Sequence, residues 1–369
     1  MKIGFDAKRA LMNDTGLGVY SRNLINGLLR NFPENDYHLF TPKIKEYLLE
    51  QIDGEYKIEL PERGIDKLIP SYWRTRNVIK DIAALRLDLY HGLSNELPFG
   101  IDKHRGVKKV VTIHDLIFLK EKKQYPLADR LIYETKIRYA CKVADKIIAI
   151  SGQTKSDLIK LIGADERKIE VVYQSCDNIF SSNITNEDME TVRLKHVLNE
   201  YFILNVSSFY PRKNHLLLVK AFEQIMAKVP HNLVLVGGYE MERKTIENYI
   251  AEKNIASRIK ILSNLPLAEL AAIYRLADLF VYPSQFEGFG IPILEAMTSG
   301  TRVLASDVEC FRELGGDAID YFDLDNLNSF AEKMLHLIHY KSQETALLKT
   351  RSEIFSNETF SKKIMEAYQ

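Results

Sequence analysis

Two glutamates in one short segment are the residues of this chain best suited to chemistry. Glu287 and Glu295 lie eight positions apart in SQFEGFGIPILEAM, with Gly288, Gly290 and Pro292 between them. On one helix, eight residues would separate the carboxylates by roughly 12 Å along the axis. The paired carboxylates of glycosidases lie roughly 5–9.5 Å apart. The spacing is therefore a poor fit to a hydrolytic pair.

The proline between the two glutamates predicts where a helix begins. Proline is favoured in the first turn of a helix, so Pro292 places Glu287 in the preceding loop and Glu295 inside the helix. Gly288 and Gly290 would let the backbone bend and approach a ligand closely. The helix N-terminus offers unpaired N–H groups to a phosphate. The segment thus predicts a nucleotide-binding loop in which one glutamate reaches a sugar and the other a ribose.

The elements that must position this loop alternate regularly. Short apolar runs are followed by amphipathic helical patterns in both halves of the chain, which is typical of parallel sheets in α/β layers. The runs are KIGF, KKVVTI and KIIAI in the first half, and YFILNV, NLVLV, LFVYP and RVLAS in the second.

A polar segment from Asp177 to Asn199 interrupts this alternation and marks a domain boundary. We therefore predict an α/β protein of two doubly wound, Rossmann-like domains, residues 1–180 and 181–355, followed by a final helix over 356–369.

Bulk composition excludes several classes of protein. The 369 residues carry 50 Lys+Arg and 50 Asp+Glu, so nucleic acid is not an expected partner. The three cysteines, Cys141, Cys176 and Cys310, show no C-x-x-C pairing, which argues against a zinc site or disulfide framework and favours a reducing compartment. No leader segment and no run of 18 apolar residues is visible. We expect a cytoplasmic protein.

Three further positions carry residues that could bind a ligand or take part in catalysis. Arg212 and Lys213 follow an apolar run, and adjacent cations on a βα loop suit a diphosphate that gains charge on leaving. His114 follows KKVVTI, at the strand end where open α/β sheets bind ligands, although a lone histidine is more often structural. Gly16 and Gly18 lie between the first strand and its helix, where they are ligand-loop glycines or plain turn glycines.

Six segments, in order along nearly the whole chain, resemble the motifs of the retaining glycosyltransferases with the GT-B fold, specifically glycosyltransferase family 4 with its E-x7-E signature. In chain order they are TGLGVYSRNLINGL, TIHDL, IIAISGQTKSDL, SSFYPRKNHLLLVKAF, LVLVGG and FEGFGIPILEAMTSGTRVLASD.

The resemblance implies roles for named residues. The catalytic set would be His114, Glu287, Arg212 and Lys213, and the donor-binding set Gly16, Gly18, Gly288, Phe289, Gly290, Ile291 and Glu295. Glu287 would contact the donor sugar, Glu295 the ribose and the two cations the diphosphate, with no metal and no cofactor besides the nucleotide-sugar substrate. Many members carry an arginine near the position of Ser207 or Phe209, which this chain lacks, and a proline where it has Arg302.

The resemblance also implies an arrangement of domains. The N-terminal domain would bind the acceptor and the C-terminal domain the donor. The two would face each other across a cleft, and the last helix would return to the N-terminal domain.

The donor and acceptor are suggested by two motifs. TIHDLIF and YPRKN most resemble mannosyltransferases of surface-polysaccharide synthesis, which favours mannose from GDP-mannose and a saccharide or lipid-linked saccharide acceptor. The alternatives are a transferase that uses UDP-glucose, UDP-N-acetylglucosamine or dTDP-rhamnose, a GT-B nucleotide-sugar epimerase, and a non-catalytic sugar-nucleotide-binding subunit.

One further pattern concerns the membrane. IDKLIPSYWRTRNVIK places Ile65, Leu68, Ile69, Tyr72 and Trp73 at helical spacing among cations, and residues 118–146 add many more. A basic, Trp-bearing amphipathic segment can lie peripherally on an anionic membrane. A half-buried helix with a solvated charged face is the alternative interpretation.

Overall fold

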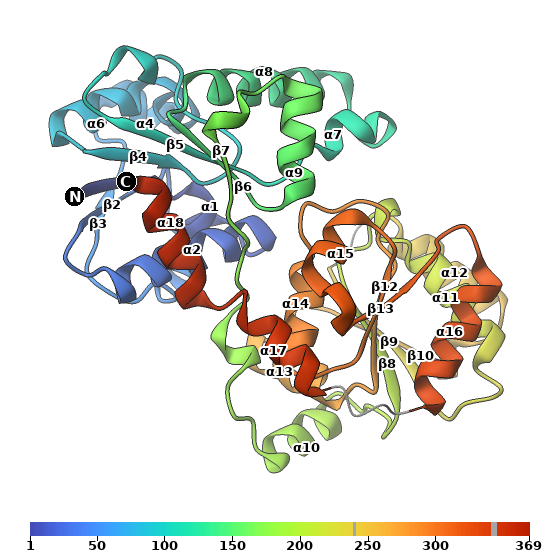
Figure 1. The fold of residues 1–369 in the computed structure, drawn as a ribbon. Helices are drawn as coiled ribbons and strands as arrows, with labels where there is room; N and C mark the ends of the chain where they lie inside the picture. The colour runs from blue at the N-terminus through green and yellow to red at the C-terminus, as the bar shows by residue number, and fades with distance from the viewer. Residues whose placement is uncertain (239–240, 341–344) are drawn as a thin grey trace. The chain divides into compact units, whose positions relative to one another are not determined.

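Two parallel sheets form the framework of the protein (Figure 1). The structure is a computed structural model that describes residues 1–238, 241–340 and 345–369. It divides into two compact units, Met1–Ser175 with Ser356–Gln369, and Cys176–Phe355. The first unit ends ahead of residue 180, because Phe180 is fully buried and contacts Tyr274 of the second unit.

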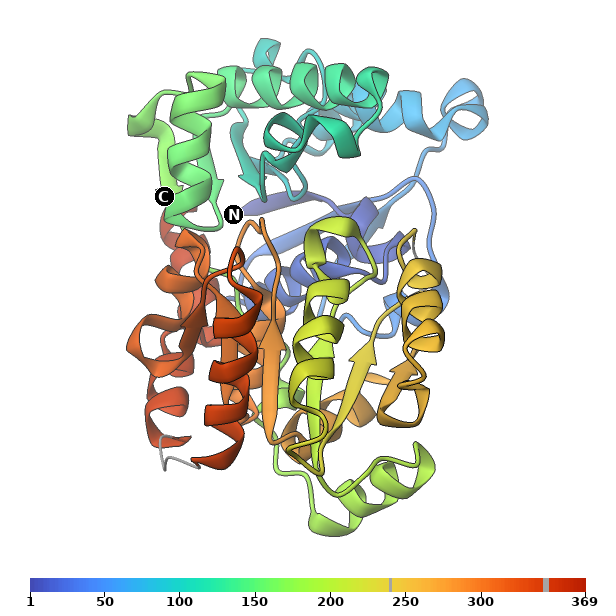
Figure 2. The ribbon, with the colours of Figure 1, turned by 90° about the vertical axis from the view of Figure 1, so that its right-hand side faces the viewer.

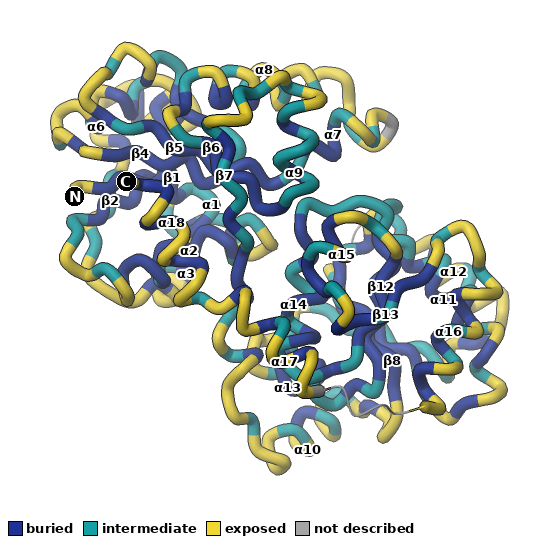
Figure 3. Tube along the Cα trace, in the orientation of Figure 1, coloured by how far each residue is buried: buried dark blue, intermediate teal, exposed yellow. Residues whose placement is uncertain are grey.

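The sheet of the first unit has the strand order β3-β2-β1-β4-β5-β6-β7, with all neighbours parallel. Its strands are β1 Lys2–Asp6, β2 Asp36–Phe40, β3 Lys57–Glu59, β4 Leu89–Gly92, β5 Lys108–Ile113, β6 Lys146–Ala149 and β7 Ile169–Val171. In the register of β1 and β2, Ile3 lies opposite Tyr37 and Phe5 opposite Leu39. Because both faces are covered, the inner strands are buried along nearly their whole length (Figure 3).

Helices pack on both faces of this sheet (Figure 1). They are α1 Lys8–Met12, α2 Gly16–Asn31, α3 Glu46–Leu49, α4 Gly64–Leu68, α5 Pro70–Tyr72, the π-helical η1 Trp73–Asn77, α6 Val78–Leu85, α7 Ile117–Lys120, the 3₁₀ turn η3 Lys122–Gln124, α8 Leu127–Val143, α9 Gly152–Asp157 and the π-helical η4 Leu158–Ile162. The core between α6, α8 and the sheet includes Ile82, Val111, Ile113, Ile137 and Ile147.

The sheet of the second unit has the order β10-β9-β8-β11-β12-β13, again parallel. Its strands are β8 Phe202–Val206, β9 Asn232–Val236, β10 Ile259–Leu262, β11 Leu279–Tyr282, β12 Val303–Ser306 and β13 Asp320–Phe322. The predicted class, two doubly wound Rossmann-like sheets, is confirmed.

The helices of the second unit also lie on both faces of their sheet (Figure 2). They are α10 Asn186–Lys195, α11 His215–Ile225, α12 Arg243–Glu252, α13 Leu267–Leu276, α14 Ile291–Thr298, α15 Glu309–Gly315, α16 Leu327–His339 and α17 Thr345–Glu353. Figure 1 shows α11, α12 and α16 on one side of the strands and α13, α14 and α17 on the other. None of the helices in the described ranges is long and apolar enough to cross a membrane.

The last helix, α18 Asn357–Tyr368, returns to the first unit and packs on α2, as predicted (Figure 1). Ser356 caps it by accepting from the N–H of Thr359. At its far end, the hydroxyl of Tyr368 lies 2.6 Å from Nδ1 of buried His91. The polar contact and the buried apolar face together tie the end of the chain to the first sheet.

Candidate functional site

The chemistry-bearing residues of the second unit meet where its strand order reverses. β8 and β11 are neighbours, and the chain proceeds outward from them in both directions. Ligands of open α/β sheets bind beyond the carboxyl ends of strands at such a point. Lys213 follows β8 in the 3₁₀ turn Pro211–Lys213, and Glu287 follows β11 in a loop. Strand order therefore brings together two residues that are 74 positions apart.

One oxygen of Glu287 is held by four donors. Its Oε1 accepts from Lys213 Nζ, from Arg212 Nη1 at 2.7 Å and from Ser284 Oγ at 2.7 Å. The Tyr282 hydroxyl lies 3.3 Å from the same oxygen and 2.7 Å from Lys213 Nζ. No hydrogen bond of the described residues reaches the second oxygen, Oε2, and that oxygen is not fully buried.

Burial and charge act in opposite directions on Glu287, whose side chain is 12% exposed. Burial alone would raise the pKa of this carboxyl, but the cations of Lys213 and Arg212 outweigh burial and lower the pKa to about 2. Glu287 is therefore an anion at neutral pH, with one oxygen engaged and the other available.

Sequence reasoning placed Glu287 and the two cations separately and missed their contact. It also missed Tyr282 and Ser284, which complete the shell around Oε1. The only signal for these two is their position in LFVYPS, directly at the end of a strand. Arg212 also donates from Nη1 to the carbonyl of Phe286 at 2.9 Å, which ties the two βα loops together.

The second glutamate lies inside α14, as predicted. α14 begins at Ile291 with Pro292 in its first turn, and Gly290 precedes it with φ of 116°. Oε2 of Glu295 accepts a hydrogen bond of 2.8 Å from the hydroxyl of Tyr274, a residue that sequence reasoning missed. Burial, with a smaller contribution from Asp177, raises the pKa of Glu295 to about 7.

The other residues of the glycine loop differ in whether their side chains are free to contact a ligand. Phe289 is buried, and its ring contacts Phe355 with centroids 5.8 Å apart, so its side chain belongs to the core of the unit. Gly288 and Ile291 are half-buried and flank the start of α14. The ligand contacts predicted for this loop would therefore come from the main chain.

His114 lies directly after β5, at the carboxyl edge of the first sheet. Its Nε2 is 2.8 Å from the carbonyl of Leu93, so Nε2 carries the proton and Nδ1 can accept. Burial is the main cause that lowers the pKa of His114 to about 4, with Arg9 adding to it. Nδ1 has no hydrogen-bond partner among the described residues and is not fully buried. His114 is thus a neutral, oriented hydrogen-bond acceptor at pH 7.

Gly16 and Gly18 are predicted to lie in a loop before the helix. In the structure α2 begins at Gly16, so both glycines lie in its first turn. A Cβ on Gly18 would come within 1.8 Å of the carbonyl oxygen of Asn13, so close packing alone requires glycine there. A Cβ on Gly16 would meet nothing within 4 Å. Packing therefore accounts for the glycine at position 18 and leaves Gly16 open to a functional explanation.

Comparison with known proteins covers most of the chain. The family described as Glycosyltransferase Family 4 matches residues 15–178, and the one described as Glycosyl transferases group 1 matches residues 187–352. The chain is 26% identical over 287 residues to O-antigen chain mannosyltransferase B of Escherichia coli, covering 76% of this chain and 74% of that protein.

Two more relatives extend the comparison. The serotype-specific mannosyltransferase WbdA of Escherichia coli is 29% identical over 271 residues, which are 70% of this chain and 33% of WbdA. The crystal structure of Anabaena Alr3699/HepE in complex with UDP-glucose has a TM-score of 0.77 at 18% identity, with 99% of this chain and 98% of that chain covered, and it shows a shared fold. The chain belongs to glycosyltransferase family 4, the group 1 glycosyltransferases, a family of retaining enzymes with the GT-B fold.

Proposed function

We propose that this glycosyltransferase moves a hexose, with retention at the anomeric carbon, from a nucleotide sugar to a saccharide or lipid-linked saccharide in surface-polysaccharide synthesis. GDP-mannose is the proposed donor. The names of two relatives, O-antigen chain mannosyltransferase B and mannosyltransferase WbdA, support a mannosyl donor.

The environment of Glu287 is the observation that carries this proposal. A carboxylate kept ionised by two cations, with Oε2 unoccupied by any described residue, can accept hydrogen bonds from sugar hydroxyls. Four donors on Oε1 orient the carboxylate before the substrate arrives. Such preorganisation removes the need to reorient the group during the reaction.

The cations serve the other end of the donor. When the glycosidic bond breaks, negative charge grows on the leaving diphosphate, and Arg212 and Lys213 are proposed to stabilise it. The main-chain N–H groups at the start of α14, around Ile291, add the positive end of the helix dipole. Arg212 is proposed to substitute for the arginine that many members carry earlier in this loop.

Glu295 and His114 would contact hydroxyl groups at the two ends of the donor. Oε2 of Glu295 is engaged by Tyr274, so its other oxygen is proposed to accept from the ribose. His114 would accept from a sugar hydroxyl through Nδ1, because Leu93 holds the proton on Nε2. Gly16 and Gly18 are proposed to let the start of α2 approach the donor.

A thermal-shift panel tests the donor assignment. GDP, UDP, ADP, dTDP and their common sugar conjugates would be added to the wild type, to Lys213→Met and to Lys244→Met, which removes an exposed cation of α12. At 100 times its dissociation constant a cognate donor stabilises by about 2.7 kcal/mol, enough to raise the unfolding midpoint by a degree or more. We expect GDP-mannose to shift the wild type and Lys244→Met, and not Lys213→Met.

Each alternative predicts a different outcome of the same panel. A shift with a UDP- or dTDP-sugar alone would replace the mannosyl donor and keep the site. Turnover of a nucleotide sugar without acceptor would indicate an epimerase, and binding with neither hydrolysis nor transfer a non-catalytic subunit. A shift that Lys213→Met retains in full would contradict the proposed diphosphate site.

A further inference from the structure

The first half of helix α8 exposes large apolar side chains. None of its residues from Leu127 to Lys136 is buried, because the buried face of the helix begins only at Ile137. Leu127 is 63% exposed, Leu131 56% and Ile132 52%. A contiguous set of exposed apolar residues on one helix is typical of an interaction surface.

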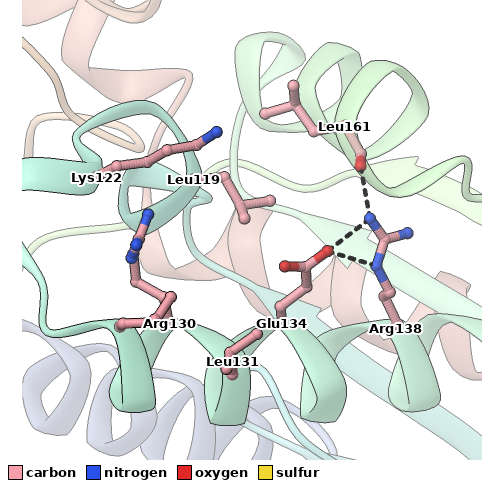
Figure 4. A pocket seen from close by; sticks show the side chains of 8 residues that line it. Leu119, Lys122, Arg130, Leu131, Glu134, Arg138 and Leu161 are labelled. Atoms are coloured by element: carbon pink, nitrogen blue, oxygen red, sulfur yellow. Dashed lines mark hydrogen bonds and ion pairs between the residues drawn. The ribbon is translucent and has the colours of Figure 1, made fainter.

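Beside these residues lies a pocket of about 300 Å³ between α7, η3, α8 and η4 (Figure 4). Leu119, Leu127, Leu131 and Leu161 supply its apolar lining. Figure 4 shows the side chains of Lys122 and Arg130 on the same side of the pocket. The pocket therefore combines an apolar lining with two cations on the same side.

The charges on the opposite side of the pocket are already balanced. Arg138 is paired with Glu134, with Nε 2.8 Å from Oε1, and donates to the carbonyls of Leu161 and Ile162 at 3.2 and 2.9 Å. Lys122 and Arg130, in contrast, form no ion pair or side-chain hydrogen bond with any residue that the structure describes. Nε of Arg130 is buried without a partner, which is an unfavourable state for a charged donor.

The surrounding segment carries a matching excess of positive charge. Residues 117–143 contain seven Lys+Arg and three Asp+Glu. An anionic oxygen in the pocket would pair with the charges of Lys122 and Arg130. A water-soluble phosphate would use the two cations but leave Leu127, Leu131 and Ile132 in water. An anionic lipid uses both, because its chain covers the apolar residues beside its phosphate.

We propose that this pocket binds the phosphate of an anionic lipid, with the lipid chain against Leu127, Leu131 and Ile132 of α8. The surface would hold the first unit on an anionic bilayer. Lipid binding at this pocket does not depend on the proposed transfer reaction, and its loss would leave donor binding intact.

The structure buries part of the other basic segment, IDKLIPSYWRTRNVIK, whereas its Ile65 and Leu68 are 57% and 82% exposed. Trp73 is 1% exposed, and its Nε1 donates to Asp81 at 2.6 Å, so Trp73 is a core residue, in agreement with the half-buried alternative. Arg74 of that segment is buried in ion pairs with Asp6 and Glu96. Helical periodicity alone does not show which apolar face is covered.

Vesicle flotation tests the proposal with the full chain. Vesicles of phosphatidylcholine with about one third phosphatidylglycerol would be compared with pure phosphatidylcholine at low salt. Wild type would be compared with Lys122→Gln/Arg130→Gln, with Leu127→Ser/Leu131→Ser, and with Lys244→Gln/Lys253→Gln as a control for net charge in the second unit. Unfolding midpoints of all variants would be measured as well. They should stay close to that of the wild type, because all the substituted residues except Arg130 are exposed.

We expect the wild type and the control pair to float with anionic vesicles only. Each cation in contact with an anionic surface contributes roughly fivefold to partitioning, so the pocket variant should partition about 25-fold less, and the leucine variant should also partition less. Equal flotation of pocket variant and wild type would overturn the proposal. The proposal would also be overturned if the wild type did not float with anionic vesicles. Self-association of the wild type through Leu127 and Leu131 in sedimentation experiments without lipid would overturn it as well.

Discussion

At the scale of residues, Glu287 presents two different oxygens to its surroundings. Oε1 accepts from Lys213, Arg212 and Ser284, whereas Oε2 has no described partner. Removing one partner of a buried ion pair typically costs about 3–5 kcal/mol, because a charge is left uncompensated. Here a second cation remains when either one is removed, so a variant such as Lys213→Met should lose donor affinity before it loses its fold.

Glu295 should make donor binding depend on pH near neutrality. Its pKa is raised to about 7, so the apo protein binds its proton below that pH, whereas the proposed ribose contact favours the carboxylate. The donor dissociation constant should therefore rise as pH falls from 8 to 6, approaching tenfold per pH unit in the limit. His114, with a pKa of about 4, does not titrate in this window.

Isothermal titration of the nucleotide against wild type and Glu295→Gln measures this effect. The glutamine variant should bind more weakly and show no such dependence. As pH rises, the stability contributed by Glu295 should fall while donor affinity increases. A folded-state pKa above the ordinary value of 4.5 means that the contribution of Glu295 to stability is fully present below pH 4.5 and is lost as pH rises through 7. Binding that is independent of pH in the wild type would contradict the ribose assignment.

At the scale of elements, the junction before α14 depends on Gly290. Its φ of 116° is strained for any residue with a Cβ, and that Cβ would lie 3.0 Å from the ring of Phe311. Gly290→Ala should therefore destabilise the second unit by about 1–3 kcal/mol in thermal or urea unfolding. Gly16→Ala is the matched comparison, because its Cβ meets nothing within 4 Å and it should be neutral or slightly stabilising. Equal losses would show that packing at Gly290 is not the cause.

Arg302, which stands where the family usually has proline, holds the end of a helix. Its Nη1 donates to the carbonyls of Leu337 at 3.1 Å and Tyr340 at 2.6 Å, which terminate α16. The guanidinium thus satisfies helix-end carbonyls that would otherwise need water or a capping residue.

Arg302→Ala should lower the free energy of unfolding of the second unit by about 1–2 kcal/mol, because charged hydrogen bonds to these carbonyls are lost. Lys333→Ala is the control. Lys333 lies 3.8 Å from Asp320, the same carboxylate that Arg302 approaches, and a half-exposed pair of this kind contributes under about 1 kcal/mol. If both variants lose the same stability, the helix-end contacts are not what Arg302 supplies.

At the scale of the whole molecule, the last helix, α18, packs with the first half of the chain and forms part of the first unit. α18 buries Phe360, Ile364, Met365 and Tyr368 against the first unit. His91 lies between the hydroxyl of Tyr368 and that of Thr112, at 2.6 and 2.9 Å, in full burial. The end of the chain therefore contributes a buried apolar face and a buried polar contact to the first unit.

Tyr368→Phe should destabilise the first unit by about 1–3 kcal/mol, because Nδ1 of buried His91 loses its partner. The exposed Tyr340→Phe should stay within about 0.5 kcal/mol of wild type. Unfolding would be followed by hydrogen exchange at the amides of β4 and β5. Unchanged protection of these strands in Tyr368→Phe would show that the contact with His91 is not needed to hold α18.

The sequence by itself determined the architecture. Strands covered on both faces read as continuous apolar runs, so the two parallel sheets, the start of α14 at Ile291–Pro292 and the returning helix α18 could be predicted from local patterns and from the order of the family motifs.

Only the tertiary structure decided which side chains meet. Lys213 and Glu287 touch because β8 and β11 are neighbours, and strand order is not written in any local pattern. Tyr274 reaches Glu295 from helix α13, because α13 and α14 pack against each other in the folded unit. Exposure is likewise a property of the packed chain: Trp73 and Leu131 both lie in basic amphipathic segments, yet the first is covered by its own unit and the second faces water.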